Sequence, residues 1–326
     1  MRVIIQILCW AIQRTNRSDS LSFGEGRGEA RIFTVKRISK LLLYATCFFL
    51  LSNCKEENGE RGILLLSYNV AGLPEGISSS HPKTYTSSIS PLLNEFDIIH
   101  LQEDFCYHDS LLLYDKHPYR TETTGCVPNG DGLNTFSNFP VSDVARFPWN
   151  DCSGFDCLTP KGFYYSRITL ADNVQVDFYN IHCNAGSSEE AFAARRKNIA
   201  QICDYIRQHS AGKAAIVMGD FNSRYTREED TIRALLDMGF KDAWIELIRG
   251  GDVPAISPDR LSDCDSSRTN ANCERVDKIF YRSDSTVTIT ALSYRVDDER
   301  FYYRGNDTLQ LSDHWPLLSE FKFASK

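Results

Sequence analysis

Apolar residues fall into short runs along this chain, and most of the runs have the length of a β-strand. Residues 63–70 (ILLLSYNV) and 97–104 (DIIHLQED) are compact apolar runs, which predict buried strands. Residues 131–141 (DGLNTFSNFPV) indicate a strand and a turn. Residues 162–170 and 174–183 alternate apolar and polar positions and are separated only by ADN, which predicts a β-hairpin.

The second half of the chain carries both helical and strand patterns. Residues 187–210 are strongly helical and open with Ser187 and Glu190 at the spacing of a capping box. Residues 214–222 (AAIVMGDFN) predict a buried strand that stops at Gly219. A second box, Thr226 with Glu229, predicts a helix that Gly239 closes.

Three further strand patterns, at 276–283, 286–296 and 315–323, complete the chain. Many strands with a few helices between them predict an α/β or α+β sandwich. Polar residues lie at or beside the ends of these strands, where they can converge on one edge of a sheet. They are Asn69, Glu103, His182, Asp220, Asn222, Asp277, Asp313 and His314.

Taken singly, three of these residues have an ordinary structural explanation, whereas Asp220 and Asn222 of GDFNS are harder to dismiss. Asn69 fits a turn, Glu103 fits an exposed charge at a strand end, and His182 fits a structural histidine. Together they supply what metal-assisted hydrolysis of a phosphate ester requires. Oxygen ligands for a hard cation such as Mg²⁺ come from Glu103, Asn69 and Asp313.

A histidine and two donors complete the expected chemistry. His314 has an intrinsic pKa suited to proton transfer, and a carboxylate can orient its other ring nitrogen. His182 and Asn222 can donate hydrogen bonds to phosphate oxygens.

The motif order SYNVAG, LQED, NIHC, GDFNS, VDKIF and LSDHWP resembles the endonuclease/exonuclease/phosphatase superfamily, also called deoxyribonuclease-like, over residues 62–324. The resemblance implies a four-layered α/β sandwich: two packed, mainly antiparallel sheets flanked by helices. The catalytic domain would then cover residues 62–326.

The resemblance also implies a role for each polar residue. Glu103 and Asn69 are the metal-site residues, with Asp313 on the metal side. His314 is the catalytic histidine and Asp277 orients it. Asp220 and Asn222 position water and phosphate, and His182 contacts the scissile phosphate. Either Asp220 or His314 takes the proton from water, and the cation is Mg²⁺, with Mn²⁺ or Ca²⁺ as alternatives.

The substrate class is narrowed by similarity to secreted bacterial sphingomyelinases, which resemble this chain at LSYNVAGLPE. Those enzymes carry an aromatic membrane-inserting hairpin where this chain has residues 294–314. We therefore expect a phosphodiesterase acting on sphingomyelin or a related phospholipid. Phe301, Tyr302 and Tyr303 have a simpler alternative, which is packing against the sandwich.

Three other functions stay open: an extracellular nuclease, an inositol-phosphate phosphatase and a non-catalytic surface binding protein. The net charge of the whole chain is −7, and residues 55–326 hold 28 Lys/Arg against 40 Asp/Glu. So acidic a body lacks the basic groove that nucleic-acid binding uses. No basic run follows GDFN, which disfavours the inositol-phosphate phosphatase.

The N-terminal region has the layout of an export signal. Within residues 35–60, three basic residues and a short apolar run precede Cys54. The run LLSNC resembles a bacterial lipobox, which predicts a lipidated Cys54 and a cell-surface lipoprotein or secreted enzyme; an uncleaved anchor is the alternative. Residues 1–54 are thus a leader, 1–34 are expected to lie upstream of the true start, and 55–61 form a linker.

Eight of the eleven cysteines lie outside the leader, and an even number in an exported chain suggests disulfides. The local spacing favours two pairs, Cys152 with Cys157 and Cys264 with Cys273. A zinc site is the alternative, although no matched Cys and His spacing supports it.

Overall fold

The computed structural model describes residues 62–257, 261–264, 270–297, 299–304 and 308–326. The predicted leader, the linker and the lipidation site Cys54 lie outside the described residues. Among the described helices, none has both the length and the apolar character needed to cross a bilayer.

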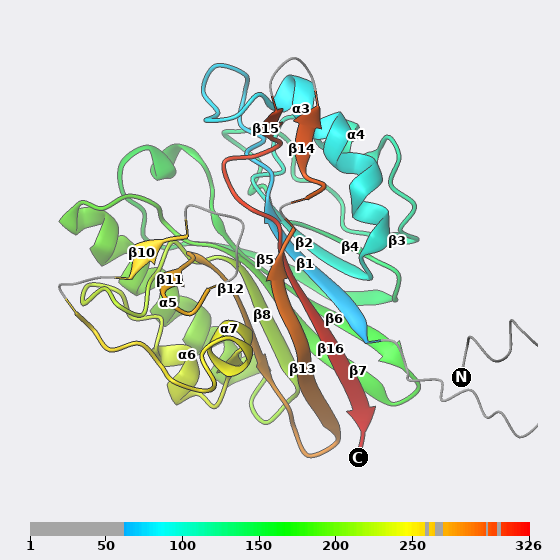
Figure 1. Ribbon diagram of the computed structural model, residues 1–326, viewed down its shortest axis with the longest axis vertical. Coiled ribbons are helices and arrows are strands. Elements are labelled where there is room, and N and C mark those ends of the chain that lie inside the picture. The colour runs from blue at the N-terminus through cyan, green and yellow to red at the C-terminus, as the bar shows by residue number, and fades with distance from the viewer. Residues whose placement is uncertain (1–61, 258–260, 265–269, 298, 305–307) are drawn as a thin grey trace, which may run out of the picture. The chain divides into compact units, whose positions relative to one another are not determined.

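Two six-stranded sheets form the domain (Figure 1). The first sheet has the order β13 (Val287–Val296), β16 (Leu317–Ser325), β1 (Ile63–Asn69), β2 (Ile98–Gln102), β4 (Asn134–Ser137) and β3 (Tyr119–Arg120). The second has the order β5 (Val141–Pro148), β6 (Gly162–Ala171), β7 (Val174–His182), β8 (Ala215–Asp220), β12 (Asp277–Arg282) and β9 (Lys241–Asp242). Most neighbouring strands are antiparallel, so the predicted fold class of two mainly antiparallel sheets is confirmed.

The hydrophobic core lies between the sheets and under the helices. Leu65 on β1 faces the second sheet, while its neighbour Leu66 faces outward, because successive side chains on a strand alternate. Helix α3 (Pro82–Ile89) and the 3₁₀ turn η1 (Ser90–Glu95) cover the outward face. Helix α5 (Glu189–His209) places Ile199, Ile202 and Ile206 in the core that includes the second sheet.

The remaining elements are short. They are helices α4 (His108–Leu112), α6 (Ala234–Asp237) and α7 (Ala243–Leu247), the turn η2 (Gly154–Leu158), the pair β10 (Ser262–Asp263) and β11 (Cys273–Glu274), and the pair β14 (Tyr302–Arg304) and β15 (Thr308–Gln310).

Each sheet has one parallel pair at its centre, and this pairing creates a common edge for the site. Asn69 at the end of β1 lies opposite Gln102 at the end of β2. In the second sheet, His182 ends β7 opposite Asp220 at the end of β8, and Asp220 lies opposite Asp277, which begins β12. We call this end of the sandwich the rim.

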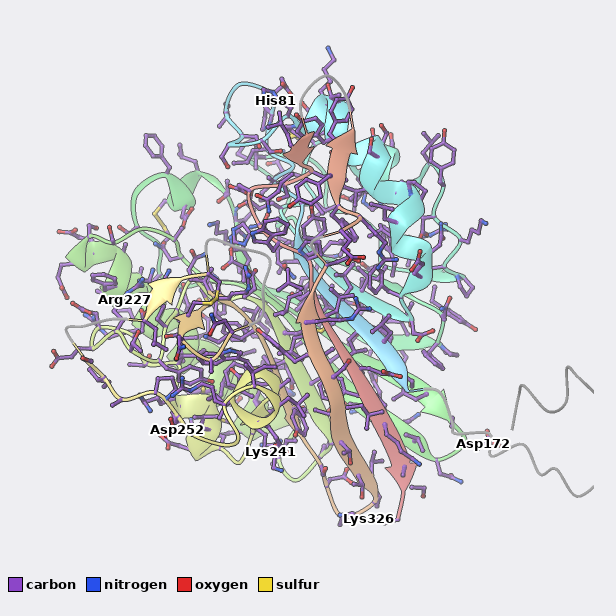
Figure 2. The ribbon with its side chains drawn as sticks, in the orientation of Figure 1. His81, Asp172, Arg227, Lys241, Asp252 and Lys326 are labelled. Atoms are coloured by element: carbon purple, nitrogen blue, oxygen red, sulfur yellow. A yellow bond between two sulfur atoms is a disulfide. The ribbon has the colours of Figure 1, made fainter. Side chains whose placement is uncertain are left out.

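The opposite end of the sandwich, which we call the base, holds the β6–β7 turn and the end of β16. Figure 2 shows Asp172 of that turn and Lys326 at this end of the molecule, with His81, which precedes α3, far from both.

Two helix predictions need correction. The cap of α5 is Ser188, whose Oγ accepts a hydrogen bond from the Ala191 amide at 3.2 Å, so the predicted cap at Ser187 is wrong by one residue. The helix predicted from Thr226 is reduced to the four residues of α6. Thr226 Oγ1 donates instead to Glu274 at 3.1 Å, which holds this segment as an irregular loop, and Gly239 follows α6 with φ +80°.

Three disulfides are present among the described residues. Cys152 is joined to Cys157 and Cys264 to Cys273, as the local spacing predicts. The third, between Cys106 and Cys126, was not predicted. Cys183 and Cys203 are buried free thiols, so only six of the eight cysteines outside the leader are paired.

Candidate active site on the rim

Asn69 connects the two sheets at the rim. Its amide Nδ2 lies 3.2 Å from Glu103 Oε1 and 3.3 Å from Asp220 Oδ2, so one side chain contacts carboxylates of both sheets. Its Oδ1 accepts a hydrogen bond from the Ala71 amide at 3.0 Å, which fixes the orientation of the side chain.

Glu103 follows directly after β2 in a left-handed backbone conformation, with φ +56°. Its carbonyl oxygen accepts hydrogen bonds from the amides of Gly72 and Phe105, at 3.0 and 2.8 Å, which hold this unusual conformation in place. Burial raises the pKa of the Glu103 carboxyl, while the charge of Lys161 and the hydrogen bond from Asn69 oppose that shift.

Asp220 lies at the centre of the cluster. His182 Nε2 is 3.4 Å from Asp220 Oδ2 and 3.8 Å from Glu103 Oε1, and His314 Nε2 is 3.6 Å from the same Asp220 oxygen. Burial raises the pKa of Asp220, and burial lowers the pKa of His182 well below its ordinary value. His182 is therefore a neutral imidazole at physiological pH.

His314 is paired with a carboxylate on its other ring nitrogen. Its Nδ1 lies 3.0 Å from Asp277 Oδ2. Burial alone would lower the pKa of His314, but the charges of Asp277 and Asp220 outweigh burial and raise it well above the ordinary value. The histidine thus lies between two carboxylates, one of which can set its tautomer.

Asn222 and Asp313 lie at the margins of this cluster. The Asn222 amide nitrogen of the backbone donates to Asp220 Oδ1 at 2.9 Å, while its side chain donates to the Cys183 carbonyl at 3.2 Å. Asp313 is exposed and accepts a hydrogen bond from Ser79 Oγ. Its charge contributes to the raised pKa of Glu103, so it belongs to the same electrostatic environment.

A cavity of about 350 Å³ opens beside His314. It is lined by Arg224, Cys264, Glu274, Arg275, Val276, Asp277, Asp313, His314 and Trp315. The cavity gives a substrate access to the histidine from the side that carries Asp313.

Two groups of these residues can hold a metal ion. Asp220, Asp277 and His314 offer ligand atoms within 4.8 Å of one another. The other candidate is the Glu103 carboxylate, an oxygen ligand that suits hard cations. Asn69 beside it presents Nδ2 to Glu103 and Oδ1 to the Ala71 amide, so its amide must turn before Asn69 becomes an oxygen ligand. Glu103 and Asp220 bring two carboxylates beside the neutral His182, so negative charge accumulates here and a divalent cation fits the donor set.

Lys161 is a residue of this site that the sequence pattern did not reveal. It is buried, and its Nζ lies 2.9 Å from Asp156 Oδ1. Burial has the largest effect on the pKa values of Glu103, His182 and Asp220, and the Lys161 charge lowers the pKa of all three. No local pattern marks this lysine, which follows the Cys152–Cys157 disulfide by four residues in the sequence.

The aromatic residues before the Asp–His pair pack against the domain. Phe301 is 1% exposed, and its ring centroid lies 5.2 Å from that of Tyr68. Tyr303 lies beside Tyr85 at 4.9 Å, and Tyr302 beside Trp315 at 5.7 Å. These three side chains therefore pack against the sandwich, which was the alternative to a membrane-inserting hairpin, although β14 and β15 do pair antiparallel.

Residues 66–260 match the model of a protein family described as endonuclease/exonuclease/phosphatase family 2. The chain belongs to this family. The superfamily resemblance seen in the motifs is thereby confirmed, and members of this family are hydrolases of phosphate esters.

Two curated relatives in mycobacteria are sphingomyelinases. Those of Mycobacterium tuberculosis and Mycobacterium bovis are 37% identical to this chain over 271 residues, which is 80% of this chain and 53% of each relative. The chain spans about half the length of these relatives. An inositol phosphosphingolipids phospholipase C of Saccharomyces cerevisiae is 28% identical over 185 residues, 52% of this chain and 38% of that protein.

Solved structures share the fold at low sequence identity. Sphingomyelinase C from Streptomyces griseocarneus superposes with a TM-score of 0.56 at 18% identity, over 79% of this chain and 99% of that one. A β toxin variant of Staphylococcus aureus with bound magnesium ions gives 0.58 at 18% identity, over 80% and 100%. A mannosyl-6-phosphatase of Bacteroides thetaiotaomicron gives 0.58 at 19% identity, over 80% and 100%.

Proposed function

We propose that this protein is a metal-dependent phosphodiesterase that cleaves sphingomyelin or a closely related phospholipid. The observation that carries the proposal is the convergence of Asn69, Glu103, His182, Asp220 and His314 on one rim. The 37% identity to mycobacterial sphingomyelinases supports the choice of substrate.

In this proposal the two sheets contribute different parts of the reaction. Glu103 of the first sheet would hold the cation, with Asp313 on the same side, and Asn69 would join it by turning its amide oxygen away from the Ala71 amide. Mg²⁺ is the cation we propose, with Mn²⁺ or Ca²⁺ as alternatives, and it would polarise a phosphoryl oxygen and offset negative charge that builds up there. Asp277 Oδ2 is already bonded to His314 Nδ1, so we prefer Asn69 and Glu103 to the group around Asp277.

The second sheet carries the groups that move protons and bind the phosphate. Asp277 fixes the orientation of His314 through the bond to Nδ1, which leaves Nε2 directed at Asp220. A water in contact with both Nε2 and Asp220 Oδ2, which lie 3.6 Å apart, can lose its proton to whichever of the two groups is unprotonated. Neutral His182 donates a hydrogen bond to the scissile phosphate, Asn222 positions the loop that carries Asp220, and Lys161 stabilises the negative charge of the phosphate.

We also propose that the enzyme is exported. Three disulfides support this, because such bonds persist in oxidising compartments and are rare in the cytosol. A lipid anchor at Cys54 is part of the same proposal, and metabolic labelling with a radioactive fatty acid, compared between wild type and Cys54→Ala, tests it.

A substrate panel tests the proposed function. Purified residues 55–326 are incubated with sphingomyelin vesicles, inositol phosphosphingolipid, inositol phosphates and plasmid DNA, each with Mg²⁺ or with EDTA. We expect release of phosphocholine from sphingomyelin that EDTA abolishes. Cleavage of DNA without phosphocholine release would overturn the lipid assignment, and hydrolysis of none of the four would favour a binding protein.

A further inference from the structure

The loop between β5 and β6 exposes apolar side chains at its tip. We call residues 149–161 the disulfide loop, because Cys152 and Cys157 close it. Phe155 is 89% exposed and Leu158 is 65% exposed, and both lie on or beside the turn η2. Single exposed apolar residues are common on protein surfaces, but here two of them project from one short turn.

The disulfide loop is hydrogen-bonded to residues that follow His182 at the rim. The Ser153 amide donates to Asn184 Oδ1 at 2.7 Å, and the Ala185 amide donates to Asp156 Oδ2 at 2.6 Å. Asp156 also pairs with the buried Lys161. Residues 184 and 185 follow His182 closely, so the tip has a defined position relative to the catalytic cluster.

Two other segments at the rim carry an exposed apolar side chain. Ile77, in the loop that leaves β1 after Asn69, is 71% exposed, and Leu309 on β15 is 46% exposed. In Figure 1 the β14–β15 pair and the green loop from β5 to β6 both extend beyond the sheets at the rim end. Separate apolar tips distributed around a site suit a flat partner better than a peptide, which needs a continuous groove.

The charge of the protein indicates which flat partner is suitable. The chain has a net charge of −7, the one lysine of the loop, Lys161, is buried and paired with Asp156, and Lys197 is paired with Asp151 of the loop at 2.6 Å. Attraction to an anionic membrane needs a cluster of free basic residues, which this loop does not supply in its described part. Contact must therefore depend on apolar insertion, which suits a zwitterionic bilayer surface.

We propose that the disulfide loop is a membrane-contact element whose Phe155 and Leu158 side chains insert into the interfacial layer of a phosphocholine bilayer. Hydrogen bonds to residues 184 and 185 fix the loop to the rim, so an inserted loop holds the rim toward the lipid surface. The inference rests on the proposed lipid phosphodiesterase function, and it adds how the rim reaches a substrate that stays in the bilayer.

Vesicle sedimentation in EDTA tests the contact without catalysis. The double variant Phe155→Ser/Leu158→Ser is compared with Val144→Ser/Leu292→Ser, which removes two exposed apolar side chains (52% and 46% exposed) from strands β5 and β13. We expect the loop variant to bind phosphatidylcholine–sphingomyelin vesicles roughly tenfold or more weakly, since each inserted side chain contributes apolar transfer energy. The control should bind like wild type, and added salt should change wild-type binding little.

A fluorescence measurement tests whether the side chain at position 155 enters the bilayer. Phe155→Trp should show a blue-shifted emission on vesicles, and brominated phosphatidylcholine should quench it more than the wild-type tryptophans. Equal partition of the loop and control variants, or an unquenched tryptophan, would overturn the proposal. A loop variant that self-associates less in sedimentation velocity but still binds vesicles would also overturn it, because the exposed side chains would then contact a second copy of the protein.

Activity separates this inference from the proposed function. With bis(p-nitrophenyl) phosphate, a soluble diester, the loop variant should keep the wild-type rate, whereas its rate on vesicles should fall with binding. A wild-type protein that binds vesicles through Phe155 but releases no phosphocholine would refute the proposed function and leave the membrane contact standing.

Discussion

At the scale of single residues, the amide of Asn69 has a role that a carboxylate could not fill. Its Nδ2 donates to Glu103 and to Asp220, and so it keeps these two carboxylates from facing each other without a donor between them. An aspartate at this position would add a third negative charge and remove the donor. The residue type is therefore set by its two neighbours.

The pair His314–Asp277 gives the first prediction. His314→Ala should lower kcat on the working substrate by about 10²–10⁴-fold, because it removes a group that transfers protons. Asp277→Asn should retain the fold and lose part of that factor, since an amide can no longer fix the Nδ1–H tautomer. Steady-state kinetics measure both, and an unchanged kcat in His314→Ala would rule out this site.

Lys161 gives the second prediction. Lys161→Met keeps most of the side-chain volume but removes the charge that acts on Glu103 and Asp220, so kcat on the soluble diester should fall by roughly 10²-fold. The matched control is Lys197→Met, which removes an exposed, paired lysine of α5. If both variants show the same small loss, Lys161 has only a structural role.

At the scale of elements, the disulfides differ in what they constrain. Cys106–Cys126 spans 20 residues and lies three residues after Glu103, whereas Cys152–Cys157 spans 5. Loop-closure entropy then predicts a loss of about 3 kcal/mol in unfolding free energy for Cys106→Ser/Cys126→Ser and about 2 kcal/mol for Cys152→Ser/Cys157→Ser. Urea denaturation measures both, and the reverse order would contradict the entropic explanation.

The strands were the elements that the sequence predicted well, because alternation and compact apolar runs reflect burial within a few residues. The helix expected at Thr226 failed because its hydroxyl bonds to Glu274, 48 positions away, which no local pattern encodes. The same limit applies to the bond between Cys106 and Cys126 and to Lys161. Their partners become neighbours only after the sheets have formed.

The site was predicted mainly through motif order, since the implied residues lie at or within four residues of strand ends and the parallel central pairs bring those ends together. The motif order could not show how these residues contact one another. In the structure, Asp313 and the Asn222 side chain lie at the margin of the cluster, and Asn69 is the residue that joins the sheets. The roles of these residues remain predictions for the kinetic tests above.

At the scale of the whole molecule, His100 couples stability to pH. It is fully buried between the sheets beside Phe178, and burial lowers the pKa of His100 to about 3. The unfolded chain binds a proton on this histidine below a pH of about 6.5, while the folded protein does not bind it until about 3. The unfolded state is therefore favoured as pH falls through this window.

The expected size of this effect is about 2 kcal/mol of unfolding free energy between pH 7 and pH 5. His100→Gln should remove that part of the pH dependence, and His209→Gln, at an exposed position, is the matched control. Denaturation at both pH values measures the slope. Should His100→Gln fold poorly, an NMR titration of His100 in the wild type that shows protonation above pH 5 would contradict the prediction.

The antiparallel pairing of β1 with β16 also has a practical consequence. Ile63 lies opposite Phe321 and Ser325 ends β16 at the base, so the first and last strands of the domain start and finish near each other, away from the rim. A protein immobilised on a sensor surface through a C-terminal tag would present its rim to the solution. A short linker from residue 326 to residue 62 would also permit a circularly permuted enzyme, with new ends placed in the Gly212 turn at the base.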